Sequence, residues 1–163
     1  ARPRQQHGPR AAALLKRETA VIKSHGERRA WQKALGAFRD LPRRGALPDV
    51  TAYNATISAC GRASQWVRGL ALFDELRTSG LSPSVATFST VISLRARRRE
   101  WALAVALLAE LLQLGLEPSV VVCSACISAC AGGQQWVRAL DFLAFMQRGA
   151  IEPNVITYGD DQL

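Results

Sequence analysis

The stretch VTAYNATISACGRASQWVRGLALFDELRTSGLSPS, residues 50–84, determines the architecture because its pattern returns along the chain every 35 residues. All four tryptophans are spaced by this period, and so are series of proline, isoleucine and glycine. The series are Trp31, Trp66, Trp101 and Trp136; Pro48, Pro83, Pro118 and Pro153; Ile22, Ile57, Ile92 and Ile127; and Gly45, Gly80 and Gly115. A fixed period of this kind is the sequence signature of stacked repeats.

Each repeat has the pattern of two helices. In residues 50–84, Tyr53, Ile57 and Cys60 recur at helical spacing and predict a first helix over about residues 51–61. Apolar residues from Trp66 onward recur in the same way and predict a second helix over about residues 65–78. Gly80 follows as the expected helix C-cap, and a proline stands three residues later. Because one hairpin of this size cannot bury both faces, the hairpins must stack into a solenoid.

The repeats divide the chain into residues 15–49, 50–84, 85–119 and 120–154, with a truncated fifth at 155–163. Residues 1–14 precede them as a basic leader that we expect to be poorly ordered. The first repeat is degenerate, because Lys16, Arg17 and Glu18 replace the apolar and aromatic opening of the others. It also contains Pro42 inside its second helix, which should kink or end that helix early.

Composition excludes several classes of protein. The 163 residues are 48% hydrophobic, too apolar for a disordered tail, yet no apolar run is long enough to span a membrane. The formal net charge is +8, and residues 1–49 contain 12 Lys and Arg against 4 Asp and Glu. Since the other residues are balanced in charge, the basic excess belongs to the leader and the first repeat. The net charge therefore supports a nucleic-acid partner only weakly.

The repeat resembles the pentatricopeptide repeat (PPR). The residues behind the resemblance are Tyr53 and Asn54 near the start of the first helix, Ala-Leu-Phe (71–73) in the second, and Gly-Leu-Ser-Pro-Ser (80–84) at the end. Similarity to this family implies an all-α, right-handed α-solenoid of stacked helix-turn-helix hairpins that binds single-stranded RNA with one base per repeat. It implies action in RNA processing, stability, editing or translation, in a mitochondrion or plastid, with other RNA-processing proteins as further partners.

The resemblance also assigns residues to the RNA. In the family, the fifth and last residues of one repeat recognise a base, which implies the pairs Thr19 with Asp49, Asn54 with Ser84, Ser89 with Ser119, and Ser124 with Asn154. The second residue of a repeat clamps neighbouring bases, which implies Lys16, Thr51, Ala86, Val121 and Ile156. The family's pairing preferences favour a sequence near 5′-G-C/U-N-A-3′. Basic residues at the thirteenth position imply phosphate contacts by Arg62 and Arg97.

A structural alternative exists for the base-reading set. Asp49, Ser84, Ser119 and Asn154 are residue types that cap helices, and each precedes a predicted helix. Capping alone explains these four positions, but it does not explain why Thr19, Asn54, Ser89 and Ser124 are all polar at the fifth position. For the basic run that ends in Arg98 and Arg99, a phosphate contact and a solvated helix end are equally compatible with the sequence.

We expect no metal, no cofactor and no enzymatic activity. Cys123, Cys126 and Cys130 lie on one helix face, but Cys130 aligns with Cys60 in a small apolar position, and the two histidines of the chain lie far away in sequence. No catalytic motif is evident. The expected partner is single-stranded RNA, with neither a membrane nor a small-molecule substrate. Two alternatives remain: a helical-repeat scaffold for protein partners, or the repeat part of a larger RNA-processing enzyme.

Overall fold

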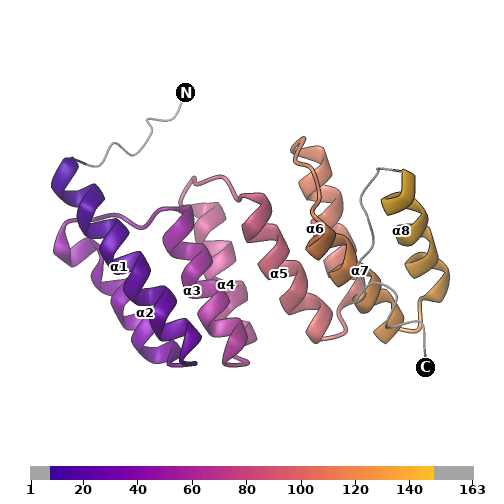
Figure 1. Ribbon diagram of the computed structural model, residues 1–163, viewed down its shortest axis with the longest axis horizontal. Helices are drawn as coiled ribbons and strands as arrows, with labels where there is room; N and C mark the ends of the chain where they lie inside the picture. Colours follow the sequence, from indigo (N-terminus) through magenta and orange to yellow (C-terminus); the bar gives the residue numbers. More distant parts are fainter. Residues whose placement is uncertain (1–7, 149–163) are drawn as a thin grey trace. The chain divides into compact units, whose positions relative to one another are not determined.

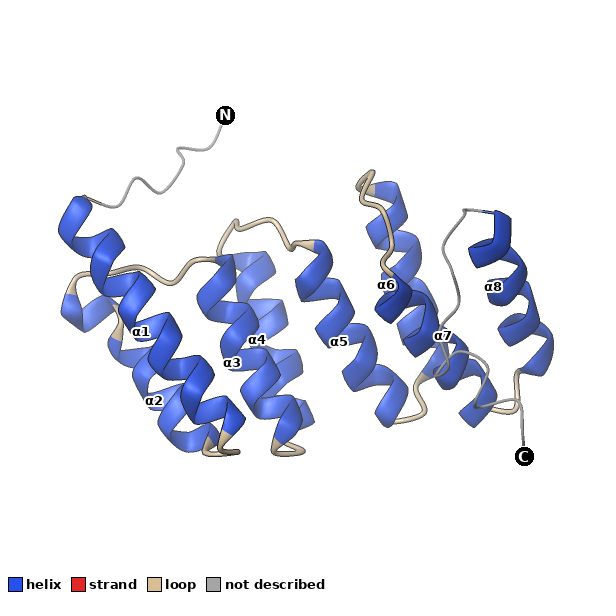
Figure 2. Cartoon of the chain, viewed as in Figure 1, coloured by secondary structure: helices blue, strands red, loops and turns tan. Residues whose placement is uncertain are grey.

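The computed structural model describes residues 8–148, which form eight α-helices, one 3₁₀ helix and no strand (Figures 1 and 2). The helices are α1 (Pro9–Glu27), α2 (Trp31–Asp40), η1 (Pro42–Arg44), α3 (Val50–Arg62), α4 (Trp66–Thr78), α5 (Val85–Arg97), α6 (Trp101–Gln113), α7 (Val120–Gly132) and α8 (Trp136–Arg148). They form two compact units, residues 1–82 and 83–163. No helix in the described part of the chain has the length and apolar character needed to cross a membrane.

The predicted all-α hairpins are confirmed. Helices α3 and α4 begin and end within one residue of the ranges that the apolar spacing predicts. Pro42 does end the second helix of the first repeat early, because α2 stops at Asp40 and Pro42 opens the short helix η1. The leader is a correction: residues 9–14 belong to α1, where Pro9 occupies the first turn, a position that suits proline.

Two kinds of left-handed residue end the helices. Gly45, Gly80 and Gly115 have φ of 84°, 81° and 71°, as the predicted glycine caps require. The turns inside the hairpins instead use non-glycine residues at one repeated position, namely Arg29, Ser64, Arg99 and Gln134, with φ of 56° or 58°. A backbone bond from Gln65 N to Cys60 O, 2.8 Å long, closes one such turn. Hairpin geometry therefore repeats along the chain even where the sequence does not supply glycine.

In the first unit, the hairpins α1–α2 and α3–α4 pack through their first helices, so that α1 and α3 lie side by side (Figure 1). Ile22 and Ile57 are fully buried there. The backbones come close because α1 presents Gly26 to Ala59, and a Cβ added at Gly26 would lie 2.9 Å from the Ala59 Cβ. The Arg68 guanidinium of α4 lies 4.7 Å from the ring centre of Trp31, a cation–π contact between successive hairpins.

In the second unit, the hairpins α5–α6 and α7–α8 are joined in the same manner, with α5 beside α7. Cys123, Ile127, Cys130 and Met146 form the buried centre of a cluster that partly covers Trp101. Arg138 lies 5.0 Å over the Trp101 ring, which repeats the Arg68–Trp31 contact of the first unit. These tryptophans therefore take part in packing between hairpins, as the periodic spacing indicates.

Candidate nucleic-acid interface

The last residues of the repeats cap helices. The Asp49 carboxylate accepts from the Ala52 backbone N–H at 2.8 Å and begins α3. Ser84 begins α5 with a reciprocal capping box to Thr87. Ser119 accepts from the Val122 N–H at 3.4 Å and begins α7. The helix-capping interpretation is therefore confirmed for the three last residues that the structure describes. Base reading would be a second role of the same side chains.

The first predicted pair shares a hollow within the first unit. Thr19 of α1 and Asp49 at the start of α3 line an open hollow of about 350 Å³. Lys16 and Thr51, the two second-position residues beside this pair, also line it. Ala12 and Leu15 complete the lining and supply its apolar part. One backbone N–H occupies Oδ1 of Asp49, and a carboxylate has about four lone-pair sites, so acceptor capacity remains for a ligand.

The third predicted pair is in contact within the second unit. Ser89 Oγ of α5 lies 3.5 Å from Ser119 Oγ at the start of α7, so the fifth and last residues of this repeat do meet. Ser89 also donates its hydroxyl hydrogen to the Val85 carbonyl at 2.8 Å. Because that hydrogen is engaged, Ser89 presents mainly an acceptor to any ligand. This pair offers a smaller set of polar groups than Thr19 and Asp49.

For the other two predicted pairs, only the exposure of individual residues is described. Asn54 is half-buried on α3 in the first unit, and Ser84 is half-buried at the start of α5 in the second. Ser124 is only 5% exposed on α7, less accessible than its counterparts in the other repeats. Its predicted partner Asn154 and the predicted clamp Ile156 lie outside the described residues. For these positions base reading stays a prediction.

The described clamp residues share one environment. Thr51, Ala86 and Val121 are each the second residue of a first helix and each is exposed. Val121 is 57% exposed, an unusual surface position for a large aliphatic side chain. Exposed apolar atoms at this repeated position suit contact with the flat face of a base, so the clamp role stays a prediction that accessibility favours.

The basic residues near the ends of α3 and α5 differ in whether they form ion pairs. Arg62 and Arg97, the last residues of these helices, are exposed, and neither has an ion-pair partner within residues 8–148. Arg95 and Arg98, in contrast, contact Glu100 at 2.7 and 2.8 Å. The hydrogen bond from Arg95, aided by Arg98, holds the pKa of Glu100 below its usual range. The guanidiniums of Arg62 and Arg97 are therefore available for a phosphate.

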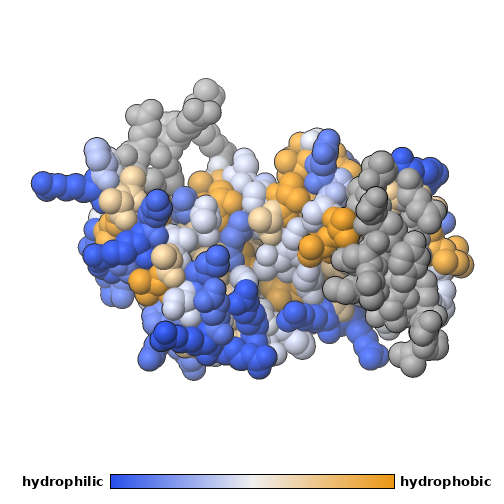
Figure 3. All heavy atoms as spheres, in the orientation of Figure 1, coloured by the Kyte–Doolittle hydropathy of each residue, from blue (hydrophilic) through white to orange (hydrophobic). Residues whose placement is uncertain are grey.

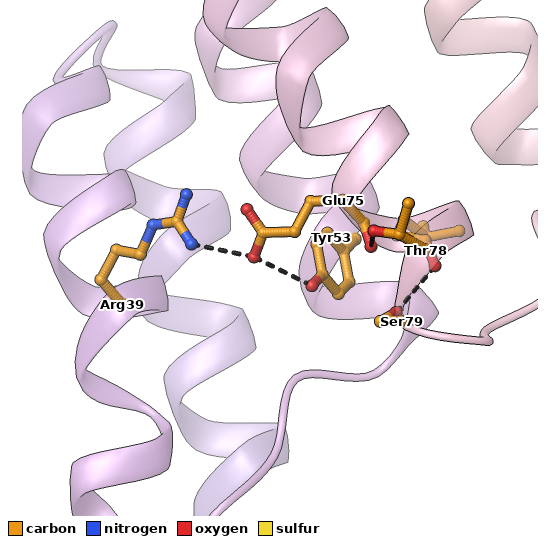
Figure 4. Close-up of polar contacts among 6 residues, drawn as sticks. Arg39, Tyr53, Glu75, Thr78 and Ser79 are labelled. Carbon is orange, nitrogen blue, oxygen red and sulfur yellow. Dashed lines mark hydrogen bonds and ion pairs between the residues drawn. The ribbon is translucent and has the colours of Figure 1, made fainter.

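A polar network joins α2, α3 and α4 in the first unit (Figure 4). Glu75 accepts from Arg39 at 2.8 Å and from the Tyr53 hydroxyl at 3.2 Å. Burial, followed by the nearby Glu75 charge, raises the pKa of Tyr53. The sequence pattern predicts Tyr53 as an apolar contact, and its hydroxyl bond could not be deduced because Glu75 lies 22 residues away.

The cysteines are buried side chains of the core. Cys60, Cys123, Cys126 and Cys130 are all free thiols and fully buried. Burial raises the pKa of all four, most strongly that of Cys126, so the reactive thiolate form is disfavoured. Among the residues that the structure describes, no group of three or more His, Cys, Asp and Glu side chains could hold a metal ion. The four cysteines therefore act as small apolar side chains in the core.

The chain matches known repeat families and solved structures. The PPR repeat family matches residues 48–97, and the pentatricopeptide repeat domain matches residues 106–159. The protein PPR10 in complex with an 18-nt psaJ RNA element is 31% identical over 90% of this chain and 21% of its own, with a TM-score of 0.77. The PPR domain of Arabidopsis thaliana protein-only RNase P 1, in complex with tRNA, is 19% identical over 92% of this chain and 78% of its own, with a TM-score of 0.79.

The chain spans about a fifth of the length of PPR10. No curated protein sequence matches it. The two repeat models together cover most of residues 48–159, and the helices there repeat with the period of the sequence. The chain belongs to the pentatricopeptide repeat family.

Proposed function

We propose that the chain is a sequence-selective, non-catalytic binding module for single-stranded RNA, with one base per repeat. The proposal rests on the hollow of the first unit, where the fifth residue Thr19 and the last residue Asp49 line one space. PPR10, which is 31% identical, forms a complex with an RNA element. We place the function in the processing, stability, editing or translation of RNA in a mitochondrion or plastid, where the module would shield a segment or present it to other factors.

The described geometry favours contacts to bases and to phosphates at separate positions. Polar side chains at the fifth position are half-buried on α1, α3 and α5, while the clamp residues beside them are exposed. Arg62 and Arg97 add cationic groups at the far ends of the first helices. Phosphate contacts would position the strand without selecting its sequence, and base contacts would select it. The preferred sequence under this proposal is near 5′-G-C/U-N-A-3′.

A mobility-shift selection from randomised RNA tests the proposal. The wild-type chain should enrich this short sequence, and Asn54→Thr should change the preferred base at the second position alone. Ser58→Thr, one turn further along α3, is the matched control and should leave the preference unchanged. Uniform weakening by Asn54→Thr, with no change of preferred base, would contradict base reading, and absence of binding to any RNA would contradict the function itself.

A protein-binding scaffold is the second candidate because the second helices of the second unit expose large apolar side chains. Leu103 and Leu112 of α6 are 47% and 42% exposed, and Val137 and Leu140 of α8 are 75% and 60% exposed. On the face drawn in Figure 3, apolar side chains gather at one end of α6, while the first unit is mostly hydrophilic. Exposed apolar side chains of this size are typical of protein-binding surfaces. This candidate would be favoured if the chain bound a protein partner but no RNA.

A further inference from the structure

Helix α1 builds one wall of the hollow in the first unit. Ala12, Leu15, Lys16 and Thr19 follow one another at spacings of three or four residues, so they share one helix face. The opposite wall is the start of α3, with Asp49 and Thr51. Ala12 has no counterpart in the other first helices, because α3, α5 and α7 begin at the first residue of their repeats, whereas α1 begins six residues earlier. Ala12 therefore adds a lining residue to this hollow that the other first helices cannot supply.

The polar groups of the hollow form an asymmetric set. Lys16 is exposed and supplies an ammonium group that only donates hydrogen bonds. Asp49 supplies a carboxylate that only accepts them when ionised, and Thr19 supplies one hydroxyl. Lys16 and Thr19 lie three residues apart on α1, so about 5–6 Å separates their Cβ atoms. The hollow is thus lined by a donor on α1 and by an acceptor at the start of α3.

Guanine has the complementary arrangement on one edge. Its O6 accepts hydrogen bonds, while the neighbouring N1–H and N2–H groups donate them. Adenine has an amino group in place of O6 and an unprotonated N1, so it would place a donor against the ammonium and an acceptor against the carboxylate. Cytosine has the same mismatch. Uracil has a carbonyl and an N–H in the matching order but no second donor. The mismatched donors and acceptors would therefore disfavour adenine and cytosine, in addition to the contacts that favour guanine.

We propose that Lys16 is a second base-reading residue of this hollow, donating to O6 of a guanine whose N1–H and N2–H groups are bound by Asp49. The inference rests on the proposed RNA-binding function and deepens it. The side chain at this position is therefore a specificity determinant, in place of the clamp that its position in the repeat implies. The apolar atoms of Ala12 and Leu15 contact the base and exclude water from its edge, which strengthens both polar contacts.

The test is a double comparison of a variant and a base analogue, measured by fluorescence anisotropy. The RNA is 5′-XCAA-3′ flanked by uridines, with X as guanosine or 6-thioguanosine, which keeps N1–H and N2–H but replaces O6 by a weaker acceptor. Lys16→Met keeps the aliphatic stem and removes the charge. It should weaken binding of the guanosine RNA about tenfold and leave the 6-thioguanosine RNA nearly unchanged. Lys23→Met removes an equally exposed charge from the same helix outside this hollow and should affect both RNAs equally.

The outcomes separate the two proposals. If Lys16→Met weakens both RNAs by the same factor, Lys16 binds phosphate and the inference is overturned, while RNA binding stands. If the wild-type chain prefers guanosine and Lys16→Met changes nothing, the inference is again wrong and the proposed function survives. If the wild-type chain binds neither RNA, both fail. Circular dichroism of each variant verifies that the helices persist, as expected for substitutions at exposed positions.

Discussion

The two units fill the same position of the repeat in opposite ways. The fourth residue of each repeat is buried, and in the first unit it is polar: Glu18, which forms an ion pair with Arg44 at 2.8 Å, and Tyr53, which donates to Glu75. In the second unit the same position is apolar, with Phe88 and Cys123 both 0% exposed. One backbone plan therefore accepts either a hydrogen-bonded polar group or a packed apolar one, provided that the polar group has a partner.

The units also differ in charge. Residues 1–82 contain 15 Lys and Arg against 6 Asp and Glu, whereas residues 83–163 contain 6 against 7. The hollow with a full donor and acceptor set lies in the basic unit, and the Ser89–Ser119 pair lies in the nearly neutral one. Under the proposed function, the selective RNA contacts would be concentrated in the first unit. The comparison also predicts that the second unit responds mainly to changes in volume and the first to changes in polar partners.

The largest effect should come from the apolar unit. Phe88→Ala removes a fully buried ring and leaves a cavity, which should lower the stability of the second unit by about 3–5 kcal/mol. Tyr53→Phe is the matched change in the first unit, because it removes only a hydroxyl and should cost about 1 kcal/mol. Hydrogen exchange of backbone amides in α5 and α3 measures the two units separately. Equal losses in both helices would refute the comparison.

A smaller loss should follow when the buried carboxylate of the first unit is neutralised. Glu18→Gln leaves the Arg44 guanidinium without its charged partner and should cost about 1–2 kcal/mol, because Arg44 is partly solvated. Glu27→Gln, at an exposed position on the same helix, is the control and should cost almost nothing. Urea unfolding measures the stability of each variant, and hydrogen exchange of the α1 backbone amides measures the local loss. The two variants are then compared. If Glu18→Gln leaves the free energy of unfolding unchanged, the ion pair between Glu18 and Arg44 adds no stability.

The ion-pair cluster of the second unit predicts a pH effect. Arg95 and Arg98 lower the pKa of Glu100 from its ordinary value of 4.5, so the carboxylate stabilises the folded state fully above that value. As pH falls through the lower folded-state pKa, about 1 kcal/mol should be lost, since the three side chains remain partly solvated. Thermal melts at pH 6 and pH 3 should show a smaller change for Glu100→Gln than for the wild-type chain. An identical pH response in both would contradict the prediction.

The smallest effect should come from the turns, where the units are alike. Ser64 and Gln134 have φ of 58°, a conformation that costs a non-glycine residue about 1 kcal/mol. Ser64→Gly and Gln134→Gly remove that strain but add chain entropy to the unfolded state, so each should stabilise its unit by about 0.5 kcal/mol or less. Differential scanning calorimetry of the two variants tests this. A clear loss of stability in either would show that its side chain is needed in the turn.

Much of the fold follows from local patterns in the sequence. The 35-residue period gives the hairpins, glycine gives three of the left-handed caps, and Pro42 gives the early end of α2. The early start of α1 has a local signal as well, because Pro9 at the first turn precedes the alanine run 11–13 and both favour helix. The left-handed residues of the hairpin turns, Ser64 and its counterparts, are not glycine and have no such signal; a repeated backbone hydrogen bond, as from Gln65 N to Cys60 O, closes these turns.

The candidate site was predictable only in part. The pairs of fifth and last residues follow from the family, and the structure brings Thr19 and Asp49 to one hollow and Ser89 and Ser119 into contact. Ala12 and Leu15 are not among the residues that the repeat predicts, because Ala12 precedes it and Leu15 occupies its first position. Contacts between distant residues, such as Glu18 with Arg44, depend on how the helices pack and have no signal in the local pattern.

Under the proposed function, the capping role of Asp49, Ser84 and Ser119 would restrict how this chain could be recoded for another RNA. A designer who exchanges the last residue of a repeat to change its base also exchanges the N-cap of the next first helix. Aspartate, asparagine, serine and threonine are preferred N-caps; replacement by glycine would cost only a few tenths of a kcal/mol, but replacement by alanine would cost about 0.5–2 kcal/mol per repeat. The usable alphabet at this position is therefore limited by helix initiation before any base is chosen, and long arrays of recoded repeats should be built from these four residues alone.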